Sequence, residues 1–506
     1  MSGEPFYITT AIPYVNAAPH IGFAFEAVLT DALARWQRLC GGDVRFLTGT
    51  DENSLKNVRA AEAERVPTAE LVQRNAMRFE ALKGVLNLSF DDFIRTSHEE
   101  RHLSGVRRLW EACTERGDIY KQHYSGLYCV GCERFYDDVE LTDGRCPVHG
   151  TPPEHVEEEN YFFQLSCYGE ALTELIECGH LRIVPVHRAN EVLHFIRAGL
   201  QDFSISRSQV RAHGWGVPVP GDPDQVMYVW FDALGNYITA LGYGNDDPLY
   251  KRYWLENPDR VHVIGKDITR FHAIYWPAML LSAGIPLPTT IFIHGFLTVD
   301  GQKIGKSLGN AIDPVALVNR YGADTVRYFL LRHVRPTEDG DFSQSRLVTA
   351  HNGELADQLG NLLSRTVSMM GRYVGGTIPE PSLTGDVDQR LIEAAELLRT
   401  NFREAMDDYA INEALAAIWQ FVGAANQYVQ HMAPWMVAKQ RNDASSPQER
   451  ATAENRLNTT LYNVAEALRL TAHYCAPFIP TTAGKIVHQL GTTIDDSGNW
   501  DTITRW

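Results

Sequence analysis

The pattern of apolar and polar positions predicts an α/β unit at the start of the chain. Residues 6–12 are β-branched and aromatic and indicate a buried strand. Residues 13–19 have the composition of a loop, and residues 21–39 carry apolar side chains on one face at helical spacing. A second short strand is expected at 44–47. The order strand, loop, helix, strand is typical of a parallel sheet with helical connections.

The alternation of strand and helix patterns is interrupted between residues 120 and 165, a segment rich in Gly, Pro, Cys and charged residues. Its composition indicates an inserted module. After residue 350 the spacing of apolar residues becomes helical throughout. Further strands are expected at 226–230, 261–264 and 291–293, helices at 355–370, 389–406, 410–432 and 448–474, a polar loop at 440–450, and a loosely held end from residue 491.

Length and composition narrow the class of protein. The 506 residues are enough for two to four domains, and 44% hydrophobic with 22% charged residues indicates a globular chain. The formal charge of −17 excludes a globally basic nucleic-acid binder, so any RNA contact must use local patches or base stacking. The sequence has no run of 18 apolar residues and no basic segment before an apolar one. We therefore expect no membrane span, no secretory signal and a cytoplasmic location.

Three of the eight cysteines cluster with a histidine in the inserted segment. Cys129 and Cys132 are separated by two residues, and Cys146 and His149 repeat that spacing after thirteen residues. Three thiolates and one imidazole complete a tetrahedral zinc site and leave no open position. The spacing therefore predicts one structural Zn²⁺ per chain, which would stabilise local folding by on the order of 10 kcal/mol or more. The alternative is four unconnected surface residues.

Two further segments indicate phosphate binding. His20 and Gly22 lie where the first strand leads into the first helix, whose N-terminal N–H groups and partial positive charge suit phosphate. Residues 303–307, Lys-Ile-Gly-Lys-Ser, place two lysines on a predicted loop, where they can neutralise a triphosphate. Each signal is weak alone, because capping histidines and solvated lysines are common. Their combination in one α/β domain is more specific.

The two segments resemble the His-Ile-Gly-His and Lys-Met-Ser-Lys-Ser motifs of class I aminoacyl-tRNA synthetases. Within that class the chain resembles methionyl-tRNA synthetases over nearly its whole length. The other supporting stretches are 11–14, 49–52, 229–233, 264–268, 271–278 and 433–435, together with the zinc knuckle.

The resemblance implies a Rossmann-like parallel-sheet catalytic domain of α/β class with a zinc-knuckle insertion, followed by an all-α helical-bundle anticodon-binding domain. A C-terminal dimerisation domain of some relatives is not recognised, so a monomer is implied. The implied divisions are 1–117 and 221–290 for the two catalytic halves, 118–220 for the insertion, 291–349 for a linking region with the lysine loop, 350–490 for the helical domain and 491–506 for a tail.

The implied activity is ATP- and Mg²⁺-dependent activation of methionine and its transfer to tRNA(Met). His20, Lys303 and Lys306 would be catalytic. ATP would contact His20, Gly22, Gly265, Asp267, Lys303, Lys306 and Ser307. The amino acid would contact Ile12, Tyr14, Asp51, Trp230, Ala233, Leu234, Tyr237, Ile268, Phe271 and His272, with Asp51 on its ammonium group. The anticodon would contact Asn361, Arg365 and Trp435.

Elementary chemistry agrees with these assignments. A thioether is polarizable and packs well at aromatic edges. His272 can donate a hydrogen bond, and such edges can come from Tyr14, Trp230, Tyr237 and Phe271. Asn361 and Arg365 are four residues apart and share a helix face, from which they can stack on and bind unpaired bases. Without the resemblance, the aromatic residues would be interpreted as ordinary core and the helix face as ordinary surface.

Three departures from the family's motifs concern the chemistry. Phe23 stands where the motif has its second histidine, Asn53 and Ser54 stand where relatives have His-Gly, and Ile304-Gly305 replaces Met-Ser. Phe23 cannot donate a hydrogen bond, and loss of one such donor typically costs roughly 3 kcal/mol of transition-state stabilisation.

Two alternatives therefore stay open beside the translation enzyme. One is a specialised paralogue that uses the adenylate to ligate amino acids in natural-product biosynthesis, such as hydrazine formation from N-hydroxylysine and another amino acid. The other is an inactive tRNA-binding or regulatory protein. The sequence does not decide the acceptor or the true amino acid, because pockets distinguish similar side chains by only about 1–3 kcal/mol.

Overall fold

A six-stranded sheet forms the centre of the N-terminal part, and every neighbouring pair of its strands is parallel. The strand predictions at 6–12, 44–47, 261–264 and 291–293 are confirmed, although the first strand ends at Thr10. In spatial order the strands are β3 (Asp92–Arg95), β2 (Asp43–Thr50), β1 (Pro5–Thr10), β12 (Asp259–Gly265), β13 (Thr290–His294) and β7 (Arg182–Val184).

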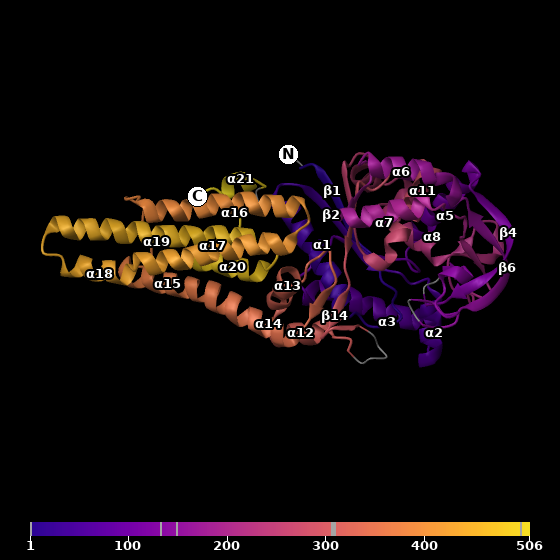
Figure 1. Cartoon of the computed structure of the whole chain (residues 1–506), viewed down its shortest axis with the longest axis horizontal. Coiled ribbons are helices and arrows are strands. Elements are labelled where there is room, and N and C mark those ends of the chain that lie inside the picture. The colour runs from indigo at the N-terminus through magenta and orange to yellow at the C-terminus, as the bar shows by residue number, and fades with distance from the viewer. Residues whose placement is uncertain (1–2, 132–133, 148–149, 305–309, 496–497) are drawn as a thin grey trace.

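The computed structural model describes residues 3–131, 134–147, 150–304, 310–495 and 498–506. The molecule is elongated, with the sheet-containing part at one end and a bundle of long helices at the other (Figure 1).

Helices cover both faces of the sheet. Alternate residues of β1 point to opposite faces, so that Phe6 and Ile8 enter one core and Tyr7 enters the other. The first core is shared with α1 and α13, and the second with α5, α9 and α11. The helix predicted at 21–39 is confirmed as α1 (Ile21–Leu39). The other covering helices are α5 (Glu100–Arg116), α9 (Asn236–Thr239), α11 (Trp276–Ser282) and α13 (Ala323–Arg332).

The order of the strands locates the crevice of the sheet. From β1 the chain continues through α1 to β2 on one side, whereas β12 lies on the other side of β1. In open parallel sheets, ligands bind outside the carboxyl ends of the strands at such a reversal of strand order. The residues that follow β1, β2 and β12 are therefore the ones placed for chemistry.

The inserted segment forms its own antiparallel sheet at the far end of the α/β part (Figure 1). One strand of the predicted 118–220 range, β7, belongs instead to the parallel sheet, where it pairs with β13 as the edge strand. The elements of this segment are β4 (Ile119–Cys129), β5 (Arg134–Tyr136), β6 (Glu154–Phe163), α6 (Gly169–Glu177), α7 (Val186–Arg197) and β8 (Phe203–Ser204).

The strand expected at 226–230 is wrong in two respects. β11 (Asp222–Met227) ends earlier and belongs to a small antiparallel sheet with β9 (Ser206–Ser208) and β10 (Pro218–Val219). Trp230 instead lies in the short helix α8 (Val229–Leu234). Most of α8 is buried, so its apolar run has no polar face to reveal a helical period.

From α14 onward the described chain is helical, as the fold prediction expected. None of the helices among the described residues is long and apolar enough to cross a membrane. The loop expected at 440–450 is shorter than predicted, because one helix ends at Asp443 and the next begins at Pro447. The helices are α14 (Gln344–Ala350), the π-helical segment η8 (His351–Gly360), α15 (Asn361–Tyr373), α16 (Asp386–Asp407), α17 (Ile411–Met432), α18 (Pro434–Asp443), α19 (Pro447–Cys475), α20 (Pro480–Gln489) and α21 (Trp500–Ile503).

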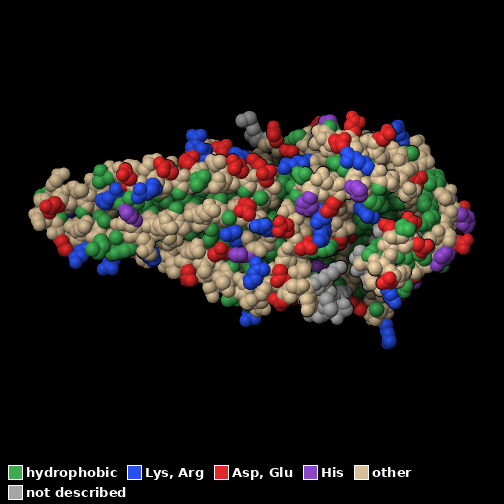
Figure 2. Space-filling view, in the orientation of Figure 1, with side chains coloured by type: hydrophobic (Ala, Val, Ile, Leu, Met, Phe, Trp, Pro, Cys, Tyr) green, Lys and Arg blue, Asp and Glu red, His purple; other side chains and the backbone are tan. Residues whose placement is uncertain are grey.

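The C-terminal end is held more firmly than predicted. Trp500 is buried and packs edge-on against Trp36 of α1, with ring centroids 4.7 Å apart, and stacks on Phe402. This contact fixes the end of the chain to the catalytic part. Charges of both signs are interspersed over the visible face of the molecule (Figure 2).

Candidate active site

The carboxyl edge of the sheet brings together predicted ligand-binding residues from distant parts of the sequence. Tyr14 follows β1 and forms a parallel bridge with Asp51, which follows β2. The backbone N–H of Asp51 donates to the Pro13 carbonyl at 2.9 Å. Gly265 ends β12, and a Cβ atom at that position would lie 2.9 Å from Oδ1 of Asp267. The Asp267 carboxylate therefore occupies the space that a side chain at position 265 would take.

Helix α1 begins at this edge. His20 caps the helix, and its Nδ1 accepts a hydrogen bond from the Gly22 N–H at 3.1 Å. A Cβ atom at Gly22 would lie only 2.9 Å from the His20 ring, so the close approach of this ring requires glycine. No acidic residue lies in the first turn of α1. The helix start therefore keeps its positive partial charge for an anion.

The chain on both sides of the lysine loop contacts the start of α1. Cδ1 of Ile304 lies 3.7 Å from the position of a Cβ atom on Gly22, and the Ile21 N–H donates to the Ile312 carbonyl at 3.0 Å. Lys306 and Ser307 lie outside the described residues, as does the side chain of Lys303. The loop is carried by β14 (Leu297–Val299) and β15 (Gln302–Lys303), which form a sheet with β16 (Gly340–Phe342).

A cavity of about 530 Å³ opens beside these elements. Its lining includes five of the predicted ligand-binding residues: Tyr14, Trp230, Asp267, Ile268 and Phe271. Other walls come from α7 and from the knuckle segment, which contributes Gly131, Tyr136 and Pro147.

The aromatic residues of the cavity form one packed group. Trp230 stacks on Phe271 with ring centroids 3.7 Å apart and an interplanar angle of 5°. Tyr14 meets Trp230 edge-on at 6.5 Å. The indole N–H of Trp230 is buried, and it has no hydrogen-bond acceptor among the described residues. Three further predicted residues, Ile12, Leu234 and Tyr237, lie in or against the second core, and Ala233 is buried on α8.

The buried His272 ring lies next to Trp230, and both of its ring nitrogens form hydrogen bonds within the protein. Its Nδ1 donates to the Ile268 carbonyl at 3.1 Å, and its Nε2 accepts from the Tyr237 hydroxyl at 2.7 Å. Burial lowers the pKa of His272 to about 4, so the ring is neutral near pH 7. In this structure both ring nitrogens bond within the protein, so the predicted hydrogen bond from His272 to the amino acid stays a prediction. The His272 ring orients Tyr237.

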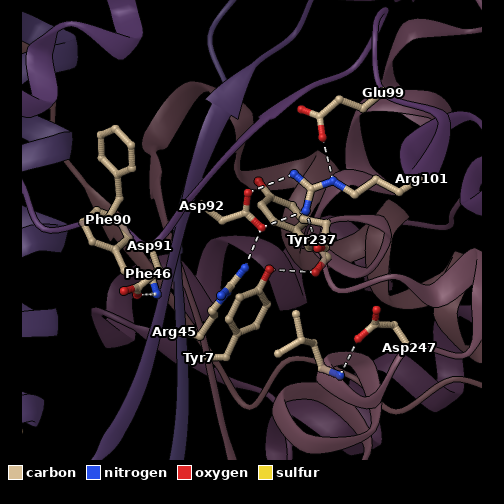
Figure 3. Close-up of polar contacts among 12 residues, drawn as sticks. Tyr7, Arg45, Phe46, Phe90, Asp91, Asp92, Glu99, Arg101, Tyr237 and Asp247 are labelled. Atoms are coloured by element: carbon tan, nitrogen blue, oxygen red, sulfur yellow. Dashed lines mark hydrogen bonds and ion pairs between the residues drawn. The ribbon is translucent and has the colours of Figure 1, made fainter.

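A hydrogen bond joins the segment that carries Tyr237 to strand β1 of the parallel sheet (Figure 3). The Tyr7 hydroxyl donates to the Tyr237 carbonyl at 2.8 Å. In the same network, Asp92 accepts from Arg45 at 2.8 Å and from Arg101 at 2.9 Å. Burial raises the pKa of Asp92, but the two guanidinium groups more than offset this and hold it below its ordinary value. These contacts hold the segment of Tyr237 against the parallel sheet.

Sequence reasoning missed a buried charge pair at the same edge. His294 ends β13, and its Nε2 lies 2.8 Å from Oε2 of Glu26 on α1. The Ala11 N–H donates to the other Glu26 oxygen at 2.9 Å. Burial lowers the pKa of His294, but the bond to Glu26 more than offsets it, so the pKa is raised above the ordinary value. The pair joins α1 to the ends of β1 and β13, and no local sequence pattern signals it.

Two of the four predicted zinc ligands lie together. Cys129 at the end of β4 and Cys146 are buried in one cluster with Tyr136, whose hydroxyl oxygen is 3.6 Å from the Cys146 Sγ. The other two, Cys132 and His149, lie outside the described residues. Within the described part of the chain, no three metal-ligating side chains converge.

The predicted anticodon residues occupy neighbouring helices of the helical domain. Asn361 and Arg365 share a face of α15, and Asn361 is exposed. The Arg365 guanidinium lies 5.7 Å from the ring centroid of Trp435, which is 41% exposed on α18. A large aromatic side chain that stays exposed beside a cation suits base stacking.

Comparison with known proteins agrees with this geometry. The family model for class I tRNA synthetases (M) matches residues 6–151 and 138–367, and the model for the anticodon binding domain of methionyl tRNA ligase matches 378–504. A methionine--tRNA ligase of Brucella suis is 46% identical over 499 residues, covering 98% of this chain and 93% of its own length. One from Mycobacterium tuberculosis is 46% identical, with 96% and 92% covered.

Two solved structures of the Mycobacterium tuberculosis methionyl-tRNA synthetase are also similar. The complex with methionyl-adenylate has a TM-score of 0.92 at 45% identity and covers 99% of this chain and 96% of its own. The apo form has a TM-score of 0.85 at 42% identity, with 98% and 95% covered. Family models over most of the chain, full-length relatives and a shared fold all agree with the motif geometry at the sheet edge. The chain therefore belongs to the methionyl-tRNA synthetase family of class I aminoacyl-tRNA synthetases.

Proposed function

We propose that the protein activates methionine with ATP and transfers it to tRNA(Met). The observation that carries this proposal is the aromatic cavity at the carboxyl edge of the sheet, whose lining residue Tyr14 forms a bridge with Asp51. Binding pockets of this kind combine apolar walls with a few polar groups that fix orientation.

The amino acid would bind with its side chain among the aromatic rings. Trp230 and Phe271 offer an apolar, polarizable surface that suits a thioether. Asp51 is 2% exposed and follows β2, where its carboxylate can hold the ammonium group. Of the other assigned residues, Ile12, Ala233, Leu234 and Ile268 would complete the apolar wall. The rings assigned beside them are those of Tyr14, Tyr237 and His272.

The phosphates of ATP would lie over the start of α1. In adenylate formation the methionine carboxylate attacks the α-phosphate and pyrophosphate leaves. His20, the N–H groups of the first helical turn and Lys306 would stabilise the developing negative charge, and Lys303 and Ser307 would contact the leaving pyrophosphate. Gly265 and Asp267 would hold the adenosine.

The terminal hydroxyl of tRNA would then attack the adenylate, while Asn361, Arg365 and Trp435 would contact the anticodon. The alternative of a ligase outside translation gains no support from the similar proteins of Brucella suis and Mycobacterium tuberculosis, which are methionine--tRNA ligases. The inactive alternative is disfavoured by the retained Asp51 and His20.

The proposal predicts methionine-dependent exchange of pyrophosphate into ATP, followed by charging of tRNA(Met). Both are measured with purified protein, and leucine and isoleucine serve as controls for the pocket. Exchange without charging would contradict the tRNA step and restore the ligase alternative. Absence of exchange with methionine would overturn the function.

We further propose that the knuckle holds one structural Zn²⁺. Two thiols buried in one small cluster fit a thiolate site, and Cys129, Cys132, Cys146 and His149 would be the ligands. The ion would stabilise the loop that supplies Gly131 and Pro147 to the cavity wall. ATP would enter as its Mg²⁺ complex, and no side chain is assigned to that ion.

Elemental analysis of purified protein is expected to find about one zinc ion per chain, and less in Cys146→Ser. Cys475→Ser is a matched control, because Cys475 is equally buried but lies in α19. Equal zinc content in the two variants would contradict the site.

A further inference from the structure

Asn53 and Ser54 depart from the family's His-Gly, and the structure gives each a role. Ser54 caps α2 (Leu55–Glu64), because its hydroxyl accepts from the Lys56 N–H at 3.0 Å. Asn53 joins the two sides of the amino-acid pocket. We propose that Asn53 is a positioning residue, which fixes the ammonium anchor Asp51 relative to the wall that carries Trp230. This inference rests on the function proposed above.

Asn53 makes three contacts with distinct elements. Its amide Nδ2 donates to Oδ2 of Asp232 at 2.6 Å and to the Thr96 carbonyl at 3.3 Å. Its backbone N–H donates to Oδ1 of Asp51 at 3.3 Å. One residue therefore connects the turn after β2, the segment after β3 and helix α8.

Asp232 continues the hydrogen-bond network from Asn53 to helix α5. It is completely buried on α8, the helix that also carries Trp230. Its Oδ1 lies 2.6 Å from Nε2 of His102 on α5, and Nδ1 of His102 lies 2.8 Å from Oγ1 of Thr239 on α9. Both carboxylate oxygens of Asp232 are thus engaged, one by an imidazole and one by the Asn53 amide. The network joins α8, which supplies Trp230 to the cavity, to α5 and α9.

The chemistry of position 53 favours an amide here. Asn53 lies between the carboxylates of Asp51 and Asp232, and it donates toward both, from its backbone and its side chain, without adding a charge. One amide nitrogen carries two hydrogens, which reach Asp232 and Thr96, whereas each imidazole nitrogen carries at most one. The family's histidine at this position could not make both contacts from a single atom, and Asp232 already receives the imidazole of His102.

Loss of the side-chain amide would break the link from the turn that carries Asp51 to Asp232 and to the Thr96 carbonyl, whereas the backbone N–H bond to Asp51 would stay. Without that link, the turn could shift relative to the wall that carries Trp230. In Asn53→Ala we expect the KM for methionine in pyrophosphate exchange to rise about tenfold, as for loss of a hydrogen bond to a charged group. The KM for ATP and the kcat should change less than about threefold by the same reasoning, because the phosphate site is built on α1.

Two methionine analogues separate positioning from general damage. Methioninol keeps the ammonium group and lacks the carboxylate, whereas 4-(methylthio)butanoate lacks the ammonium group. As inhibitors of exchange, the first should weaken about tenfold in Asn53→Ala and the second should be unchanged, because only the first uses Asp51. Equal weakening of both analogues would overturn the inference.

Asn257→Ala is the matched control. Asn257 is equally an asparagine with a buried amide, but it donates to the carbonyls of Tyr253 and Asp259 and does not contact Asp232. Its loss should lower stability and leave the methionine KM unchanged. A wild-type protein that exchanges with methionine, together with an Asn53→Ala variant that matches it, would overturn this inference alone. A wild-type protein without exchange would overturn the proposed function and this inference with it.

Discussion

Replacing Phe23 by histidine is expected to speed adenylate formation by roughly tenfold to a hundredfold, the range for adding one donor to a developing oxyanion. Phe23 is the third residue of α1 and lies on the same face as the capping His20, one turn away. The family's motif has a histidine here. An imidazole N–H at this place would reach the phosphates that the helix start attracts.

The gain in rate should come with a small loss of stability. The Phe23 ring packs edge-on against Phe79 of α3 (Thr68–Glu80), with centroids 4.9 Å apart, and closes a small apolar cluster with Val15 and Ala76. Such an aromatic pair contributes about 0.5–1.5 kcal/mol beyond its buried area. Phe23→His is therefore expected to unfold at a lower denaturant concentration than the wild type.

Phe23→Leu is the matched control, because it removes the aromatic pair without adding a donor. It should lose similar stability and gain no rate. The measurement is the single-turnover rate of adenylate formation at saturating methionine and ATP. If Phe23→His reacts no faster than the wild type, then His20 and the lysine loop already stabilise the charge and the site has been rebuilt around phenylalanine.

Features that leave a local pattern in the sequence can be predicted from the sequence alone. Helix α1 can be predicted with its observed bounds because its apolar residues keep one period over many turns. The crevice also follows from sequence, because the motif residues come directly after predicted strands. His20, Tyr14 and Asp51 therefore meet at one edge of the sheet. The family resemblance supplies the substrate, which no periodicity can.

Other features depend on contacts between distant residues. Asn53 and Asp232 are separated by 179 positions, and their bond has no local signal. Pattern alone places Trp230 in a strand, because a fully buried apolar run looks alike in a strand and in a helix. The polar C-terminal end has the composition of a loose tail, but Trp500 finds its partner Trp36 on α1, far away in the sequence. In each case the tertiary contact overrides the local preference.

The same kind of distant contact joins the catalytic part to the helical domain, at Arg327 of α13. Its side chain is completely buried and pairs with Asp31 of α1 at 2.7 Å. It also donates to the carbonyls of Phe478 at 2.7 Å and Leu86 at 3.2 Å. Burial raises the pKa of Asp31, but pairing with Arg327 and Arg35 more than offsets this, so the pKa lies below its ordinary value. One side chain thus connects α1, the segment before β3 and the turn after α19.

Arg327→Met is expected to lower the free energy of unfolding by about 3–5 kcal/mol, the cost of breaking a buried ion pair on one side. Asp31 would stay buried with less compensation, and the carbonyls of Phe478 and Leu86 would lose their donor. Arg35→Met is the control, because Arg35 pairs with the same carboxylate from within α1 and keeps a partly exposed side chain. Its cost should be smaller, about 1–2 kcal/mol, because Asp31 keeps Arg327 and the other bond lost is the one from Arg35 to the Asn87 carbonyl at 2.7 Å. Urea denaturation followed by circular dichroism measures both, and equal midpoints for the two variants would contradict a role for Arg327 in joining the domains.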